Sequence, residues 1–202
     1  MSSGTAFLVD DDDAIRDALA WLLRSRGVAS QAWSSAEAFL ADYRPDLNGC
    51  LVLDIRMSGM SGLELFDQLL ALGCTMPAIF LTGHGDVPLA VQSLKKGAFD
   101  FIEKPCNDNE LVNRVIAALQ LDREQRQHAA STASIETRLR SLTNREREVM
   151  DRILAGQYNK VIAADLNIAM RTVEVHRARI FEKMAVKSAV ELAQLLAGNQ
   201  HG

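Results

Sequence analysis

The chain has 202 residues, of which 48% are hydrophobic and 24% charged, a composition typical of a folded protein with one large core or two modest ones. No apolar run approaches the roughly 18 residues of a membrane span, and the first residues are small and polar. These features argue against a membrane protein or a secretory signal, so we expect a cytoplasmic location. Residues 1–120 carry 9 Lys and Arg against 16 Asp and Glu, whereas residues 121–202 carry 13 against 10. We therefore expect two domains with different partners. The mildly basic second half is weak evidence for nucleic acid, because a solvated helical surface produces the same count.

Residues 1–121 are predicted to form an α/β domain. Short apolar runs predict strands at Ala6–Val9, Val28–Trp33, Leu51–Leu53, Ala78–Leu81 and Phe99–Ile102. Apolar residues at helical spacing predict helices at Ile15–Leu23, Leu63–Leu72, Val87–Lys96 and Asn109–Leu121. Asn107 and Glu110 resemble a capping box at the start of the last helix. Five repeated βα units indicate a doubly wound parallel sheet with helices on both faces.

The apolar periodicity stops after Leu121, and residues 122–140 are interpreted as a linker. This segment is charged and rich in Gln, Ala and Ser, so a helical extension and a flexible tether both remain open. Residues 141–202 are predicted to be all helical. Thr143 and Glu146 form a capping box, and Gly156 ends the helix that they begin. Three further helices are expected at Asn159–Leu166, Arg171–Met184 and Ser188–Leu196, which together suit a four-helix domain with a helix-turn-helix.

Polar residues follow several of the predicted strands. Asp10 and Asp11 end the first strand, Asp54 the third and Thr82 the fourth, and Lys104 follows the fifth. These positions should meet at one edge of a parallel sheet, where such folds bind ligands. Carboxylates placed together repel one another unless a cation joins them, and hard oxygen ligands favour Mg²⁺. Asp54 is therefore a candidate nucleophile that forms an acyl phosphate while the metal and the Lys104 ammonium balance its charge.

Each of these residues has a structural explanation of its own. Asp12 and Asp13 are interpreted as helix-start residues that favour the helix dipole. Asp54 alone could be a cap, Lys104 a surface residue, and Thr82 an ordinary β-branched strand residue. Their joint placement at the ends of separate strands favours the functional interpretation.

Four separated motifs resemble the receiver domain of bacterial response regulators, in particular the FixJ-like branch, which has a flavodoxin-like fold. They are VDDD (Val9–Asp12), LVLDIRMSGMSG (Leu51–Gly62), LTGHGD (Leu81–Asp86) and FDFIEKP (Phe99–Pro105). The resemblance implies that Asp54 is the phosphoacceptor. It also implies that Mg²⁺ is held by Asp10, Asp11, Asp54 and the backbone carbonyl of Arg56, that Thr82 and Lys104 sense the phosphoryl oxygens, and that Phe101 is the switch residue.

The same resemblance implies a dimer surface on the helix that follows Thr82. Val87, Val91 and Lys95 would line it, although a merely solvated helix face remains an alternative. Two positions depart from the family. Ser58 stands where Pro is usual, which leaves the stiffness of the loop open. Cys106 stands where Phe is usual, and we interpret it as a packing residue, with redox sensing as a less favoured alternative.

The cysteines do not indicate a covalent or metal framework. Cys50, Cys74 and Cys106 form an odd set without CxxC or His-flanked spacing. Neither a disulfide framework nor a zinc site is expected.

Residues Leu142–Met184, with the sequence LTNREREVMDRILAGQYNKVIAADLNIAMRTVEVHRARIFEKM, resemble the helix-turn-helix domain of the LuxR, NarL and FixJ regulators. Val173, Ile180 and Met184 share one helix face, which leaves an arginine-bearing surface able to enter the major groove of DNA. The resemblance implies base contacts from Thr172, Glu174, Val175 and Ala178, and phosphate contacts from Lys160, Arg171, His176, Arg177 and Lys183.

Three further expectations concern this second domain. Glu174 could instead pair with Arg171 or Arg177 on a solvated surface. Ala169 stands where relatives usually have a capping Ser, which should cost about 0.5–2 kcal/mol of stability. The last helix could pair two such domains on a two-fold DNA site.

Together the two halves predict a phosphorylation-controlled transcriptional regulator of a two-component system. Its expected partners are a sensor histidine kinase, double-stranded DNA, RNA polymerase and, once phosphorylated, a second copy of the chain. It would be no enzyme beyond its own Mg²⁺-dependent phosphoryl transfer. A free-standing phosphohydrolase is less favoured because Arg56 replaces the second Asp of the DxD pattern. The remaining alternative is an interaction module that binds partners through the receiver and uses DNA only as an anchor, with Asp54 never phosphorylated.

Overall fold

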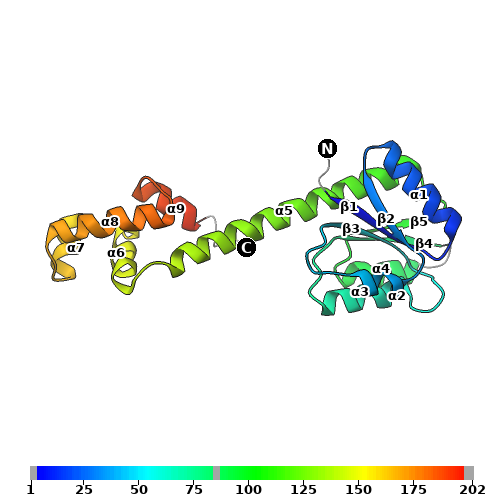
Figure 1. The fold of residues 1–202 in the computed structure, drawn as a ribbon, viewed down its shortest axis with the longest axis horizontal. Coiled ribbons are helices and arrows are strands. Elements are labelled where there is room, and N and C mark those ends of the chain that lie inside the picture. The colour runs from blue at the N-terminus through cyan, green and yellow to red at the C-terminus, as the bar shows by residue number, and fades with distance from the viewer. Residues whose placement is uncertain (1–3, 84–86, 198–202) are drawn as a thin grey trace. The chain divides into compact units, whose positions relative to one another are not determined.

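A computed structural model describes residues 4–83 and 87–197, without the side chains of Val87 and Ala90 (Figure 1). The chain divides into two compact units, Met1–Arg126 and Gln127–Gly202. None of the helices among the described residues is both long and apolar enough to cross a membrane.

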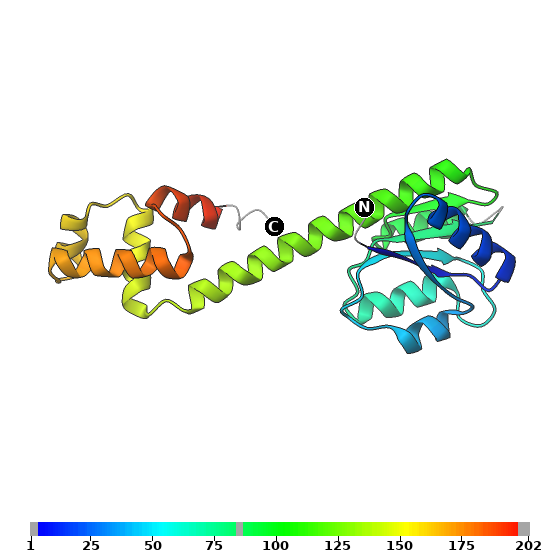
Figure 2. The ribbon, with the colours of Figure 1, turned by 45° about the horizontal axis from the view of Figure 1, so that its top comes forward.

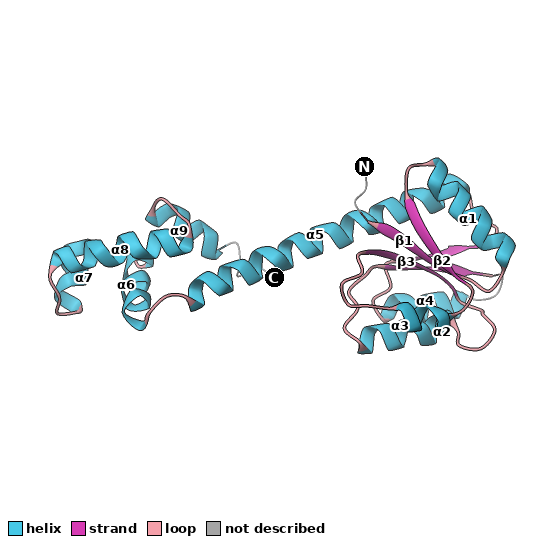
Figure 3. Cartoon of the chain, viewed as in Figure 1, coloured by secondary structure: helices cyan, strands magenta, loops and turns pink. Residues whose placement is uncertain are grey.

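The first unit is built on a sheet, drawn in magenta in Figure 3. The sheet has five strands in the order β2-β1-β3-β4-β5, and every pairing is parallel. This is the flavodoxin-like order, which confirms the predicted fold class. The strands are β1 (Thr5–Val9), β2 (Ala29–Trp33), β3 (Gly49–Asp54), β4 (Ala78–Thr82) and β5 (Asp100–Glu103).

Helices cover both faces of this sheet, because parallel strands need crossover connections. Side chains alternate along β1, so that Ala6 and Leu8 pack on one face and Phe7 and Val9 on the other. One face carries α1 (Asp13–Ser25) and the first half of α5 (Asp108–Arg140), and the other carries α2 (Ala36–Asp42), α3 (Gly62–Ala71) and α4 (Val87–Lys95) (Figures 1 and 2). Each layer has its own apolar core.

Helix α2 is absent from the helices that the sequence predicts. It spans seven residues, too few for the periodicity of an amphipathic helix to stand out. Its clearest signal is Ser35, whose hydroxyl accepts the backbone N–H of Ala38 as a cap. Phe39 is fully buried and meets Trp33 edge to face at 5.0 Å between ring centroids. The Ser35 cap and the tertiary packing of Phe39 together favour this short helix.

Helix α5 is continuous from Asp108 to Arg140, so residues 122–140 are helical. Asn107 caps it by accepting the backbone N–H groups of Asn109 and Glu110.

Further along α5, the buried carboxylate of Asp122 accepts the N–H of Gly49 at 3.0 Å. Arg126 pairs with Asp122 at 3.0 Å and donates to the carbonyl of Leu47. The packing of the first unit thus extends beyond residue 121, where we expected the domain to end.

The second unit is helical around a single core. Its helices after α5 are α6 (Asn144–Leu154), α7 (Asn159–Asp165), α8 (Met170–Met184) and α9 (Ala189–Ala197). The capping box is present as predicted: the Thr143 side chain accepts the backbone N–H of Glu146, and the Glu146 side chain accepts the backbone N–H of Thr143. Val173, Ile180 and Met184 form the fully buried face of α8, also as predicted. The turn between α7 and α8 places Asn167 at φ 53°, a left-handed conformation that Asn tolerates.

Candidate functional site

Three carboxylates meet at the carboxyl ends of β1 and β3. Asp10, Asp11 and Asp54 each place an oxygen within 4.8 Å of the other two. Asp10 and Asp54 are buried, with exposed fractions of 1% and 8%, whereas Asp11 is exposed. β1 and β3 are adjacent and parallel, so their ends lie at the same edge of the sheet. Side chains far apart in the sequence therefore converge as predicted.

Lys104 joins two of these carboxylates. Its Nζ lies 2.8 Å from Oδ2 of Asp10 and 2.8 Å from Oδ1 of Asp54. Burial disfavours the ammonium, but its hydrogen bonds to both carboxylates prevail and raise the pKa of Lys104. For Asp54 burial prevails over the hydrogen bond from Lys104, so the pKa of this carboxyl is raised. Burial therefore disfavours the charged form of Asp54, and Lys104 offsets only part of that cost.

Asp11 is held by the loop that follows Asp54. Its Oδ2 accepts the backbone N–H of Ser58 at 2.7 Å and the Ser58 hydroxyl at 2.8 Å. The backbone bond and then the hydroxyl bond from Ser58 are the main reasons that the pKa of Asp11 is lowered. In the sequence Ser58 stands out only as a departure from Pro, and no local pattern predicts its contact with Asp11.

Asp12 begins α1, as predicted. Its Oδ1 accepts the N–H groups of Ala14 and Ile15. Arg16 pairs with Asp13 and donates to the carbonyl of Asp10 at 2.7 Å, which fixes the end of β1.

The remaining pocket residues lie close to this edge of the sheet. Thr82 is buried at the end of β4 and donates its hydroxyl to the carbonyl of Ile102 at 3.5 Å. The N–H of Lys104 donates to the carbonyl of Thr82 at 2.7 Å, which ties the two residues together through the backbone. Phe101 is half-buried in β5, opposite Phe80. Residues 84–86 of the fourth-strand motif lie outside the described part of the chain.

The expected dimer surface lies on α4. Val91 is 42% exposed, and Lys95 is exposed as well. The side chain of Val87 lies outside the described residues. Leu94, 38% exposed, widens the apolar part of this face.

The cysteines are packing residues in this structure. All are free, and burial raises the pKa of the Cys50 thiol to about 12. Cys106 is half-buried and packs against the core, and burial raises the pKa of its thiol, which disfavours the thiolate form.

In the second unit, several of the residues predicted to contact DNA are exposed on α8 and α7. Of these residues, Arg171, Thr172, Val175 and Ala178 are exposed on α8, and Lys160 is exposed on α7.

Some side chains of α8 have contacts within the unit. Arg171 and Glu174 pair at 3.2 Å, which is the alternative considered for Glu174. The guanidinium of Arg177 stacks over Phe181 at 5.4 Å from the ring centroid. His176 is half-buried, and its Nδ1 is buried without a hydrogen-bond partner.

Lys183 is placed differently from what we expected of a phosphate contact. Its Nζ donates to Oε2 of Glu146 at 2.7 Å and to the carbonyl of Ser141 at 2.9 Å. Burial would raise the pKa of Glu146, but the bonds from Lys183 and Thr143 prevail and lower it. Lys183 therefore has a structural partner inside the unit, and we leave it out of the proposed DNA-contacting set.

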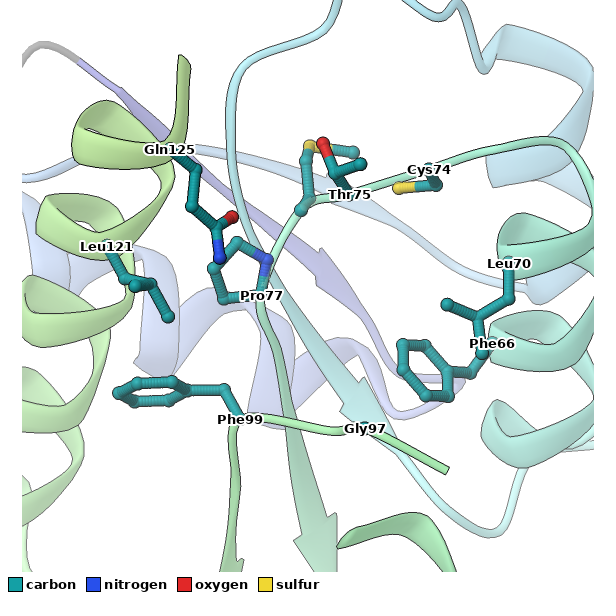
Figure 4. A pocket seen from close by; sticks show the side chains of 10 residues that line it. Phe66, Leu70, Cys74, Thr75, Pro77, Gly97, Phe99, Leu121 and Gln125 are labelled. Atoms are coloured by element: carbon teal, nitrogen blue, oxygen red, sulfur yellow. The ribbon is translucent and has the colours of Figure 1, made fainter. Parts of the chain in front are cut away.

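A separate pocket lies at the amino ends of β4 and β5, away from the carboxylates (Figure 4). Its lining is mainly apolar and includes Phe66, Phe99 and Leu121, while Thr75 and Gln125 add polar groups. It contains no cluster of titratable side chains, and we assign it no ligand.

Each unit matches the model of a known protein family. Residues 6–116 match the model of the response regulator receiver domain, and residues 140–196 match that of the bacterial regulatory proteins of the luxR family. The chain belongs to the response regulators with a LuxR-type DNA-binding domain. It is a transcriptional regulator of a two-component system and not a catalytic enzyme, which sets the phosphohydrolase alternative aside.

Several relatives match almost the whole chain. The C4-dicarboxylate transport transcriptional regulatory protein DctR of Rhodobacter capsulatus is 48% identical, covering 96% of this chain and 99% of its own. The transcriptional regulatory protein FixJ of Azorhizobium caulinodans is 47% identical over 95% of this chain and 92% of its own. The solved structure of response regulator StyR has a TM-score of 0.90 and 42% identity, covering 96% of this chain and 98% of that one.

Proposed function

We propose that Asp54 accepts a phosphoryl group from the phosphohistidine of a sensor kinase and thereby controls DNA binding by α8. The observation that carries this proposal is the Lys104 ammonium, 2.8 Å from Asp54 inside a buried acidic pocket. An Asp54 oxygen would attack phosphorus, and the bond from phosphorus to the histidine nitrogen would break. Lys104 is placed to neutralise charge on the phosphoryl oxygens.

The residues of the pocket fit Mg²⁺. The carboxylates of Asp10, Asp11 and Asp54 offer hard oxygen donors within 4.8 Å of one another, and the Arg56 carbonyl would complete the set. A bound Mg²⁺ would supply positive charge that offsets the phosphoryl oxygens and brings them toward Asp54. Burial, with a smaller contribution from the charges of Asp10 and Asp11, raises the pKa of Asp54, and a bound cation would offset the cost of keeping this carboxylate charged.

The response to phosphorylation would begin at Thr82 and Lys104. A phosphoryl group adds about −1.5 to −2 charge and strong acceptor oxygens. Thr82, whose hydroxyl donates a long hydrogen bond to the carbonyl of Ile102, would gain a better acceptor. Phe101 is the residue that we propose to reorient with it. These shifts would change the α4 face around Val91 and Lys95 and favour a homodimer.

The dimer would place two α8 helices in successive major grooves of double-stranded DNA in the cytoplasm, and recruit or block RNA polymerase there. We propose base contacts from Thr172, Glu174, Val175 and Ala178. We propose phosphate contacts from Lys160, Arg171, His176 and Arg177, the first two of which are exposed.

The deciding experiment measures binding to duplexes selected from a random pool, with and without acetyl phosphate and Mg²⁺, for the wild type and Asp54→Asn. Tighter binding by a dimer, seen only for the wild type with both additions, is the expected result. Phosphate labelling of Asp54→Asn at the wild-type rate would reject Asp54 as the acceptor. Equal DNA binding under every condition would leave DNA binding intact and reject phosphorylation as its control.

A further inference from the structure

The loop between β3 and α3 is held on both sides of Ser58. Met57 and Met60 pack against the apolar core below the loop. The N–H of Met60 also donates to Oε1 of Glu37 at 2.9 Å. Further on, Gly62 lies so close to the chain that a Cβ there would meet the carbonyl oxygen of Asp54 at 2.1 Å. Ser58 is therefore presented by a segment whose position is fixed independently of Ser58 itself.

Ser58 is exposed, yet both of its donors are aimed at a single oxygen. The backbone N–H and the hydroxyl reach Oδ2 of Asp11 at 2.7 and 2.8 Å. A proline at this position, which the family resemblance leads one to expect, has neither an N–H nor a hydroxyl. The contact therefore depends on the residue that makes this chain depart from the family pattern.

Asp11 would otherwise be the least constrained of the acidic residues. It is exposed, whereas Asp10 and Asp54 are buried and held by Lys104. In the conformation held by Ser58, Asp11 still places an oxygen within 4.8 Å of both other carboxylates. Because Ser58 donates to Oδ2 alone, Oδ1 accepts no hydrogen bond from it.

We propose that Ser58 is a positioning residue that holds the Asp11 carboxylate ready for a divalent cation and so strengthens Mg²⁺ binding. The physical reason is preorganisation. An exposed Asp samples several rotamers, and metal binding would have to select one of them. Outer hydrogen bonds that orient a metal-binding carboxylate commonly raise metal affinity. This inference rests on the metal site of the proposed function.

The test is the Mg²⁺ dissociation constant of the full chain, measured by isothermal titration without a phosphodonor. Ser58→Ala removes the hydroxyl bond and keeps the N–H, and should weaken binding roughly threefold to tenfold, less than for a buried outer ligand. Ser58→Thr keeps both donors and should restore the wild-type value. Ser34→Ala, at an exposed serine of the loop before α2, is the matched control and should bind Mg²⁺ as the wild type does.

Thermal unfolding in EDTA separates positioning from a structural role. In EDTA, Ser58→Ala should have the same melting temperature as the wild type. On adding Mg²⁺, its melting temperature should rise by less than that of the wild type. Unchanged or tighter Mg²⁺ binding by Ser58→Ala would overturn the inference and leave the metal site standing. A lower melting temperature in EDTA with an unchanged gain from Mg²⁺ would also overturn it. Failure of the wild type to bind Mg²⁺ would reject the metal site itself, and the inference with it.

Discussion

The ammonium of Lys183 donates to the buried carboxylate of Glu146 at 2.7 Å, which joins the end of α8 to the start of α6. Glu146 also closes the capping box with Thr143. Glu146→Gln should therefore lower the free energy of unfolding of the second unit by about 1–3 kcal/mol at pH 7. The measurement is urea unfolding followed by helical circular dichroism. Trp21 and Trp33 both lie in the first unit, so their fluorescence reports on that unit alone and should not change.

The pH dependence of this effect follows from the lowered pKa of Glu146. A carboxyl whose pKa is lower in the folded state contributes stability above its unfolded pKa, and loses it as the pH falls through the folded value. The difference in free energy of unfolding between the wild type and Glu146→Gln should thus be largest at pH 7 and should shrink as the pH falls. A gap that widens toward acid would show that Glu146 acts otherwise.

Asp54→Asn should make the first unit more stable at neutral pH without Mg²⁺. Burial raises the pKa of Asp54 in the folded state, so its charge opposes folding above that pKa. The advantage of the variant should shrink as the pH falls and the wild-type carboxyl takes up a proton. Urea unfolding followed by tryptophan fluorescence measures it. A less stable variant would contradict this account and would also weaken any conclusion from its loss of labelling.

Asp122→Ala should cost the first unit about 2–4 kcal/mol, because the buried N–H of Gly49 and the guanidinium of Arg126 both lose their acceptor. Tryptophan fluorescence during urea unfolding reports the loss. Glu124→Ala, at an exposed position on the same helix, should stay within about 0.5 kcal/mol of the wild type. Equal effects from both variants would mean that Asp122 does not anchor α5.

Ala169→Ser should stabilise the second unit by about 0.5–2 kcal/mol. Ala169 has the extended backbone of an N-cap, φ −70° and ψ 146°, but its side chain makes no capping hydrogen bond. A serine hydroxyl could accept an N–H of the first turn of α8. The same circular dichroism measurement applies here, and a variant no more stable than the wild type would show that the helix start is satisfied in another way.

Arg177→Ala should weaken DNA binding and lower the slope of log affinity against log salt concentration by about one. Arg123→Ala removes the same charge from an exposed position in the first unit and serves as the control. Affinities measured between low and moderate salt give both slopes. An unchanged slope would remove Arg177 from the phosphate contacts and leave it the stacking role over Phe181.

The sequence by itself determined the fold class and the members of the acidic pocket. Apolar runs separated by helical periodicity define a parallel sheet, and the ends of neighbouring parallel strands must share an edge. The sequence therefore predicts that Asp10, Asp54 and Lys104 lie together. The capping box of Thr143 and Glu146 was equally accessible, because it depends on residues three positions apart.

Only the tertiary structure decided which polar groups are partners. The Ser58 contact with Asp11, the Asp122 contact with Gly49 and the Lys183 contact with Glu146 join segments 47, 73 and 37 positions apart. A hydrogen bond depends on distances of a few tenths of an ångström, and no local pattern encodes such distances between remote segments. Lys183 illustrates this limit, since its sequence position suggested DNA and its side chain faces a buried glutamate.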